Sequence, residues 1–115
     1  MVIPPVGAVV LIDFPFADLK TSKKRPALVI ARSSLATVIL CQITSRQLPG
    51  VPGIKIAKAD FSNGGLQIIS YARPDKLFTI DASLAGQTQL GLLRTDKLNE
   101  IRSKVQSLFD ELAGV

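Results

Sequence analysis

Short runs of apolar residues, separated by polar turns, fill the first two thirds of the chain and predict β-strands. The run at 7–14 is rich in β-branched residues and is bounded by proline and glycine, as strands commonly are. Similar runs predict extended segments at 27–31, 36–43, 54–58, 66–72 and 77–80. The run at 36–43 is almost continuously apolar, which is typical of a strand covered on both faces.

The end of the chain changes to a helical period. We favour a helix that lies on the chain's own sheet over one that forms a coiled coil with a partner. Thr95 or Asp96 is a suitable N-cap. Several short strands followed by one helix predict a mainly β fold with a C-terminal helix, as a small barrel or strongly bent sheet. The apolar stripe of the helix consists of Leu98, Ile101, Val105, Leu108 and Leu112.

The connections between the runs are polar or rich in glycine and proline. Residues 63–65 read Asn-Gly-Gly and predict a turn, residues 73–76 interrupt an extended stretch, and residues 84–93 predict a connector before the helix. The chain has 115 residues, and its hydrophobic fraction of 47% is enough for one core. We therefore expect a single domain over residues 1–115.

The connection at 15–25 is polar and basic, and it predicts a flexible loop between the first two strands. The loop ends in Arg25, and Pro26 behind it favours extended backbone at Arg25. Arginine offers a rigid, planar fork of donors that fits a phosphate. The loop is therefore either a device that aims one guanidinium at a phosphate or an ordinary solvated hairpin loop whose lysines aid solubility.

Charge is unevenly distributed along the chain. The net charge is +5, from 14 basic and 9 acidic residues. A one-sided cationic field suits a polyanion such as nucleic acid, or an acidic protein segment. The alternative is a basic protein without such a partner. Between Leu19 and Ala59 there is no acidic residue, but there are Lys20, Lys23, Lys24, Arg25, Arg32, Arg46, Lys55 and Lys58.

Histidine is absent, and Cys41 is the only cysteine. This excludes a Ser-His-Asp triad and an internal disulfide, and it disfavours a metal site. Cys41 lies in an apolar run, where core packing is expected. The lone cysteine, together with the lack of a signal-peptide pattern and of a membrane-spanning run, favours a cytoplasmic protein. Any catalysis must come from Arg, Lys, Ser, Thr, Tyr or Asp.

A set of short motifs occurs in a fixed order along most of the chain. They are Gly7-x-Val9-Val10, Phe14-Pro15-Phe16-x-Asp18-Leu19, Lys24-Arg25-Pro26-Ala27-Leu28-Val29, Ile43-Thr44-Ser45 and Ser70-Tyr71-x-Arg73-Pro74-Asp75-Lys76-Leu77. In this order and spacing they resemble the PemK/MazF family of type II toxin–antitoxin toxins. The chain departs from the family pattern at Ala8, where many members carry Asp or Glu, and at 70–73, where many have an acidic-Gln-Ile-Arg run.

The resemblance implies an SH3-like barrel with a C-terminal helix, a homodimer, and sequence-specific cleavage of single-stranded mRNA without a metal or cofactor. It implies a catalytic pair, Arg25 and Thr44, beneath a basic loop that contains Lys20, Lys23 and Lys24. The expected protein partner is a cognate antitoxin that lays an acidic, otherwise disordered segment along the same grooves.

The residue chemistry indicates how such a site would act. In attack of a 2′-hydroxyl on the adjacent phosphate, Arg25 can stabilise the negative charge and Thr44 can donate a hydrogen bond. Arginine stays protonated in proteins, so an electrostatic role is favoured over a general base. Tyr71 and Phe16 are the aromatic residues available for base stacking. The full set of expected RNA contacts is Lys20, Lys23, Lys24, Phe16, Ser45, Arg46, Arg73 and Lys76.

Two alternatives stay open at this point. Core packing would account for Phe16, and ordinary surface charge would account for Arg46, Arg73 and Lys76. The runner-up function is a non-catalytic module with the same barrel, which uses its basic face to bind nucleic acid or a protein. The presence of both Arg25 and Thr44 favours the nuclease.

Overall fold

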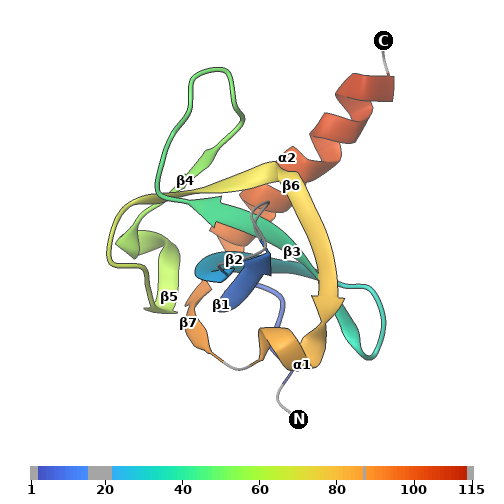
Figure 1. Cartoon of the computed structure of the whole chain (residues 1–115). Coiled ribbons are helices and arrows are strands. Elements are labelled where there is room, and N and C mark those ends of the chain that lie inside the picture. The colour runs from blue at the N-terminus through green and yellow to red at the C-terminus, as the bar shows by residue number, and fades with distance from the viewer. Residues whose placement is uncertain (1–2, 16–21, 87, 114–115) are drawn as a thin grey trace.

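The computed structural model describes residues 3–15, 22–86 and 88–113, with the backbone alone described at 14–15, 22–23 and 111–113. Figure 1 shows the order of the elements along the chain. The strands are β1 (Ala8–Pro15), β2 (Ser22–Arg32), β3 (Thr37–Thr44), β4 (Ile54–Ile56), β5 (Phe61–Gly64), β6 (Ser70–Asp81) and β7 (Gln89–Leu93). The helices are the 3-10 turn η1 (Lys58–Asp60), α1 (Ala82–Ala85) and α2 (Thr95–Ala113).

The described strands form one antiparallel sheet in the order β4-β6-β3-β2-β1-β7-β5. The sheet curls into a half-barrel, and α2 lies along one side of it with its C-terminal end projecting past the strands (Figure 1). The mainly β fold with a C-terminal helix, expected from the sequence, is confirmed. The helix packs on the chain's own sheet, because Leu98 and Ile101 are buried in the core beneath it.

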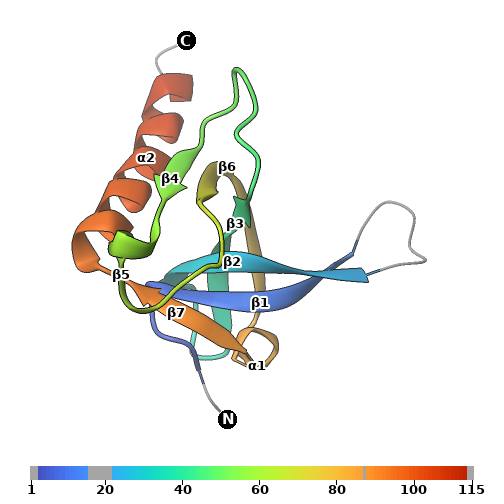
Figure 2. The same cartoon turned by 90° about the vertical axis from the view of Figure 1, so that its left-hand side faces the viewer.

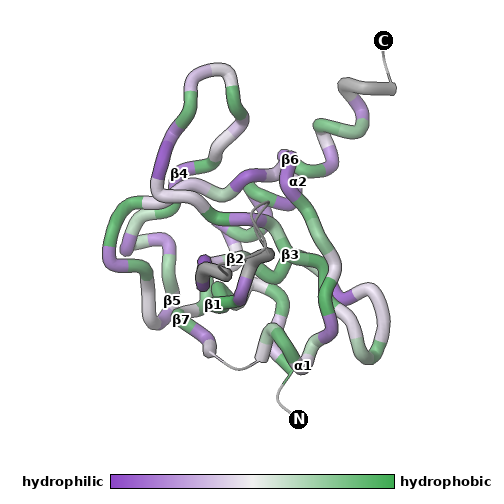
Figure 3. The backbone as a smooth tube through the Cα atoms, in the orientation of Figure 1, coloured by the Kyte–Doolittle hydropathy of each residue, from purple (hydrophilic) through white to green (hydrophobic). Residues whose placement is uncertain are grey.

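The central strands bury both of their faces, in two separate clusters. On β3, Cys41 and Ile43 belong to the cluster beneath α2, whereas Val38 and Leu40 belong to a second cluster on the opposite face, next to α1. Figure 3 shows the corresponding hydrophobic stretches along β3 and the second half of β6. A strand with both faces buried has no polar side to alternate with, which explains the nearly continuous apolar run at 36–43.

A sharp bend in β6 gives the sheet much of its curl (Figure 1). The pairing of β6 with β3 shifts register between Cys41 and Gln42, so that residues 74–76 form a bulge. Pro74 has no N–H to offer the ladder, which suits a bulge, and its side chain is fully buried. The interruption predicted at 73–76 is therefore a bend within one continuous strand.

The prediction of a connector at 84–93 is wrong, because residues 89–93 form β7, which lies between β1 and β5 in the sheet. A Cβ on Gly91 would lie 2.7 Å from the backbone nitrogen of Gly65, and a Cβ on Gly64 would lie 2.2 Å from the carbonyl oxygen of Leu90. Both glycines permit a backbone approach that a side chain would prevent. The glycines that predicted a turn and a connector instead allow two strands to pair closely.

Two other strand predictions have the wrong bounds. The strand expected at 66–72 begins only at Ser70, and Ile68 and Ile69 are exposed in the irregular segment before it. The strand expected at 54–58 ends at Ile56, because η1 follows. That turn is held by Asp60, whose Oδ2 accepts a hydrogen bond from the N–H of Ala57 at 2.8 Å.

The predicted basic loop is shorter than 15–25, because β2 begins at Ser22. The β1 and β2 strands pair from Val9 and Leu28 out to Pro15 and Ser22. This two-stranded ribbon extends beyond the rest of the sheet, as Figure 2 shows. Arg25 therefore lies inside a strand, paired with β1, and is positioned by the sheet and not by a loop.

Candidate functional site

A groove opens where β2 begins and β3 ends. We call it the strand-end groove; its volume is about 930 Å³. It is lined by residues 24–26 of β2, residues 43–46 at the end of β3, and the segment 65–68 with Ser70, and it is closed by Leu11 and Leu90. The curl of the sheet thus brings together residues from five separate stretches of the chain.

Arg25 and Thr44 come from the neighbouring strands β2 and β3, and both reach this groove. The last paired residues of β2 and β3 in this region are Ala27 and Gln42. Arg25 and Thr44 are each two residues farther along their own strand, and side chains alternate across a sheet, so both lie on the same face. Both also line the groove. The fold therefore places in one groove the two residues that the family resemblance implied as a pair.

The hydroxyl of Thr44 is held at the end of β3. Its Oγ1 accepts a hydrogen bond from the backbone N–H of Arg46 at 3.2 Å. A threonine hydroxyl that accepts a hydrogen bond still has its own hydrogen to donate. Thr44 can therefore donate to an anionic oxygen in the groove from a position that the strand end fixes.

The charge of the groove is positive. Lys24, Arg25 and Arg46 line it, together with the hydroxyl-bearing residues Ser45 and Ser70, and its described lining contains no carboxylate. Lys24 and Arg46 are exposed, whereas Arg25 is half-buried. Interactions of a charge strengthen as water is removed from around it, so Arg25 is the cation best placed to act strongly on a bound anion.

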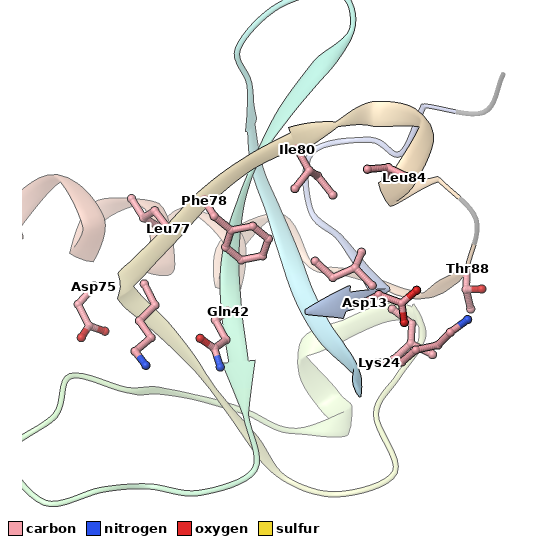
Figure 4. A pocket seen from close by; sticks show the side chains of 12 residues that line it. Asp13, Lys24, Gln42, Asp75, Leu77, Phe78, Ile80, Leu84 and Thr88 are labelled. Atoms are coloured by element: carbon pink, nitrogen blue, oxygen red, sulfur yellow. The ribbon is translucent and has the colours of Figure 1, made fainter. Parts of the chain in front are cut away.

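A second depression, which we call the apolar hollow, adjoins the groove and shares Leu11 and Lys24 with it. Its volume is about 620 Å³. Figure 4 shows an apolar wall with a polar group at each end. The wall is formed by Leu77, Phe78, Ile80 and Leu84. Asp75 lies at one end, Asp13, Lys24 and Thr88 lie at the other, and Gln42 lies between them.

Two expected RNA-binding residues lie near this hollow and not in the groove. Arg73 forms a paired contact with Asp75 across the bend in β6, with Nε to Oδ1 at 2.9 Å and Nη2 to Oδ2 at 2.7 Å. The Arg73 side chain is only 11% exposed. Its hydrogen bonds lower the pKa of the Asp75 carboxyl below the usual value. Lys76 lines the apolar hollow.

Two of the remaining expected residues follow β1 in the sequence, and the third, Lys23, is the second residue of β2. Phe16 and Lys20 lie outside the described residues, and only the backbone of Lys23 is described. The sequence analysis missed the groove wall at 65–68 and Ser70, because it assigned that stretch to a strand. The available signal was the pair Gly64-Gly65 before this stretch, since both glycines have a positive φ that other residues rarely adopt.

Other potential chemistry in the described residues is limited. Burial raises the pKa of the Cys41 thiol to about 12, and its S–H donates to the carbonyl oxygen of Arg73 at 2.9 Å. Cys41 is thus a packing residue, as expected. Within the described ranges, no group of three or more His, Cys, Asp or Glu side chains could hold a metal ion. None of the described helices is long and apolar enough to cross a membrane.

Several solved structures share this fold. A MazE–MazF complex from Deinococcus radiodurans is similar with a TM-score of 0.74 and 22% identity, over 95% of this chain and 98% of that chain. An endoribonuclease from a Mycobacterial species has a TM-score of 0.70 and 17% identity, over 96% and 94% of the two chains. The Mycobacterium tuberculosis toxin MazF-mt6 has a TM-score of 0.67 and 21% identity, over 90% and 96%.

Two sequence comparisons complement this structural likeness. The first, with curated protein sequences, gave no significant match. A model of the PemK-like, MazF-like toxin of type II toxin–antitoxin systems, however, matches residues 6–109. The match runs from the start of β1 to near the end of α2 and includes the whole strand-end groove. The chain therefore belongs to the PemK-like, MazF-like toxin family of type II toxin–antitoxin systems.

Proposed function

We propose that the chain is an endoribonuclease that cuts single-stranded mRNA at specific sequences without a metal ion or cofactor. The observation that carries this proposal is the position of Arg25 and Thr44 on one face of neighbouring strands, both lining the strand-end groove. Lys24 and Arg46 in the same groove attract the phosphates of a polyanion. The similar Mycobacterial structure, described as an endoribonuclease, supports the same activity.

The reaction is a transfer within the RNA itself. The 2′-oxygen attacks the adjacent phosphorus and loses its proton, the bond from phosphorus to the 5′-oxygen breaks, and that oxygen leaves with a proton. The products are a 2′,3′-cyclic phosphate and a 5′-hydroxyl end. Negative charge develops on the non-bridging phosphoryl oxygens, so the main task of the protein is to stabilise that charge and align the reacting atoms.

Arg25 and Thr44 divide this task. The half-buried guanidinium of Arg25 donates paired hydrogen bonds to the phosphoryl oxygens. The hydroxyl of Thr44, held by the N–H of Arg46, donates one further hydrogen bond. Arginine remains protonated in proteins, so we assign Arg25 to charge stabilisation and not to removal of the 2′-hydroxyl proton.

The other expected contacts hold the RNA strand. We propose that Lys24, Ser45 and Arg46 bind phosphates along the groove. Lys20 and Phe16 would act from the β1–β2 connection, and Lys23 from the start of β2. Arg73 is paired with Asp75, and Lys76 faces the hollow, so both would act at the margin of the bound strand. This arrangement places the strongest binding next to the Arg25–Thr44 pair.

We further propose the partners of the toxin. A cognate antitoxin, as in the similar MazE–MazF complexes, would neutralise the chain by placing an acidic segment on the cations of the groove. The toxin would act as a homodimer in the cytoplasm, where mRNA is present and where the lone Cys41 stays reduced. Co-purification of the toxin with the product of a neighbouring antitoxin gene is the direct check of that partner.

The proposal is tested by incubating the purified protein with mixed single-stranded RNA in the presence of EDTA. We expect discrete fragments that end in a cyclic phosphate and begin with a 5′-hydroxyl, and mapping of the 5′ ends will give the recognition sequence. RNA that stays intact at high protein concentration would contradict the nuclease assignment. Intact RNA that is nevertheless bound would support the non-catalytic binding module instead.

A further inference from the structure

We propose that Tyr71 is an RNA-binding residue of this site, and that its ring stacks on the base of a nucleotide next to the scissile phosphate. The inference rests on the proposed nuclease function and extends it. It adds an aromatic ring next to a groove whose described lining contains cations, hydroxyls and aliphatic side chains. The argument starts from the pairing of β3, β4 and β6.

Strand pairing places Tyr71 directly beside Thr44. Tyr71 of β6 is the partner of Thr44 of β3 on one side and of Lys55 of β4 on the other. Residues directly opposed in an antiparallel pair have Cβ atoms about 4.5–5.5 Å apart and point to the same face. Thr44 shares that face with Arg25, as the pairing of β2 and β3 requires. Lys55, Tyr71 and Thr44 therefore form one row across three strands, and Arg25 lines the groove together with Thr44.

The ring of Tyr71 has Thr44 on one side and Gly53 nearby. Tyr71 is half-buried, and Thr44, its partner on β3, lines the strand-end groove. Gly53 passes alongside: a Cβ there would lie 3.5 Å from the Cβ of Tyr71 and 4.0 Å from its Cγ. Gly53 is not among the positive-φ glycines, so its backbone accepts a side chain. A larger side chain at position 53 would therefore lie against the Tyr71 ring.

The order of groups in the row suits one nucleotide and its neighbouring phosphates. Arg25 and Thr44 lie where the scissile phosphate is proposed to bind, and the exposed Lys55 lies beyond Tyr71. When a phosphate is bound at Thr44, the base of the adjoining nucleotide lies next to the Tyr71 ring. Stacking on an aromatic ring is the usual way that single-stranded RNA is held, and every base has a face that can stack.

The chain provides its own probe for this contact. Tyr71 is the only tyrosine, and tryptophan is absent, so tyrosine fluorescence reports on this ring alone. The titration uses the full chain carrying Arg25→Ala, which keeps the RNA uncut, and a pool of short single-stranded RNAs of random sequence. Labelled RNA reports binding by anisotropy in parallel. Free tyrosine amide titrated with the same RNA corrects for absorption by the bases. We expect the fluorescence to be quenched along the binding curve.

Substitutions separate stacking from packing. Tyr71→Phe keeps the ring, and we expect affinity within about twofold of the parent. Tyr71→Leu keeps apolar bulk without a ring, and we expect affinity to fall about 5- to 150-fold, the range that base stacking provides. Gly53→Leu places a side chain beside the unchanged ring and should weaken both quenching and binding. Phe109→Ala is the matched control, because it removes an exposed aromatic residue from α2.

The outcomes are distinct. RNA binding without quenching, or equal affinity of the Phe and Leu variants, would overturn the role of Tyr71 and leave the nuclease proposal standing. Quenching by an acidic peptide and not by RNA would also overturn it, in favour of a protein contact. If RNA neither binds nor is cut by the unmodified chain, both proposals fail. Stacking is supported if RNA quenches the fluorescence of Tyr71, and if affinity falls in Tyr71→Leu and Gly53→Leu but not in Phe109→Ala.

Discussion

The strand-end groove and the apolar hollow adjoin each other and share Leu11 and Lys24, but the chemistry of their linings differs. The described lining of the groove carries cations and hydroxyls without a carboxylate. The hollow sets Asp13 and Asp75 against its lysines around an apolar wall. A carboxylate near a cation weakens the attraction of that cation for a polyanion. The described carboxylates line the hollow, so the groove is the depression that we propose as the RNA site.

The largest expected effect is the loss of cleavage in Arg25→Ala. Removing a donor that stabilises developing charge typically costs about 100- to 1,000-fold in rate. Cleavage of the mapped RNA site under single-turnover conditions gives the measurement, and an unchanged melting temperature confirms folding. Arg32→Ala is the matched control, because Arg32 is an exposed arginine at the other end of β2. An equal loss of cleavage rate in both variants would show that Arg25 has no specific role in the reaction.

The next effect concerns the hydroxyl of Thr44. We expect Thr44→Val, which keeps the shape of the side chain but loses the donor, to slow cleavage by about 10- to 100-fold through the loss of one hydrogen bond to a charged oxygen. Thr44→Ser keeps the hydroxyl and should retain most of the rate. Single-turnover rates at saturating RNA make the comparison. If valine and serine behave alike, the hydroxyl has no role in the reaction.

A smaller effect compares one cation from each depression. Arg46→Ala removes a cation of the groove, and we expect RNA affinity to fall several-fold with a salt slope lower by about 1. Lys76→Ala removes a cation of the hollow, where carboxylates offset it, and should have less effect on both quantities. Affinity is measured on uncut RNA at several salt concentrations. The opposite ranking would assign the RNA to the hollow.

The smallest expected effect is on stability, and it concerns the Asp75 carboxylate of the hollow. Asp75→Asn loses the ion pair with Arg73, and we expect the free energy of unfolding at neutral pH to fall by about 1 kcal/mol, since the pair is partly exposed to water. The hydrogen bonds from Arg73 lower the pKa of Asp75 in the folded state. The ion pair therefore stabilises the fold fully above the pKa of Asp75 in the unfolded chain, which is about 4. This stabilisation is lost as the pH falls through the lower pKa of the folded state.

Urea unfolding at neutral and acidic pH measures this difference. The gap between Asp75→Asn and the parent should close in acid, because the parent carboxyl is then protonated as well. Asp110→Asn, on the exposed surface of α2, is the control and should show no gap at either pH. RNA affinity should change little in Asp75→Asn if the pair serves the bend in β6 and not the substrate.

Local patterns in the sequence predicted several elements well. The apolar run at 36–43 corresponds to β3 with both faces buried, and the helical stripe from Leu98 onward corresponds to α2 on the sheet. In both cases the signal is the spacing of apolar residues within one element. Failures occurred where two elements meet: β7 was taken for a connector, because the closeness that Gly91 permits depends on β5.

By itself the sequence determined the mainly β class, the terminal helix, the cationic character of the chain and the residue types that suggest a site for RNA. Only the tertiary structure decided which of the cations act together. Register brings Thr44 beside Tyr71 and onto the same face as Arg25, while the bend in β6 pairs Arg73 with Asp75. The physical reason is that charges and hydrogen bonds act over a few ångströms, and only the pairing of distant strands sets distances on that scale.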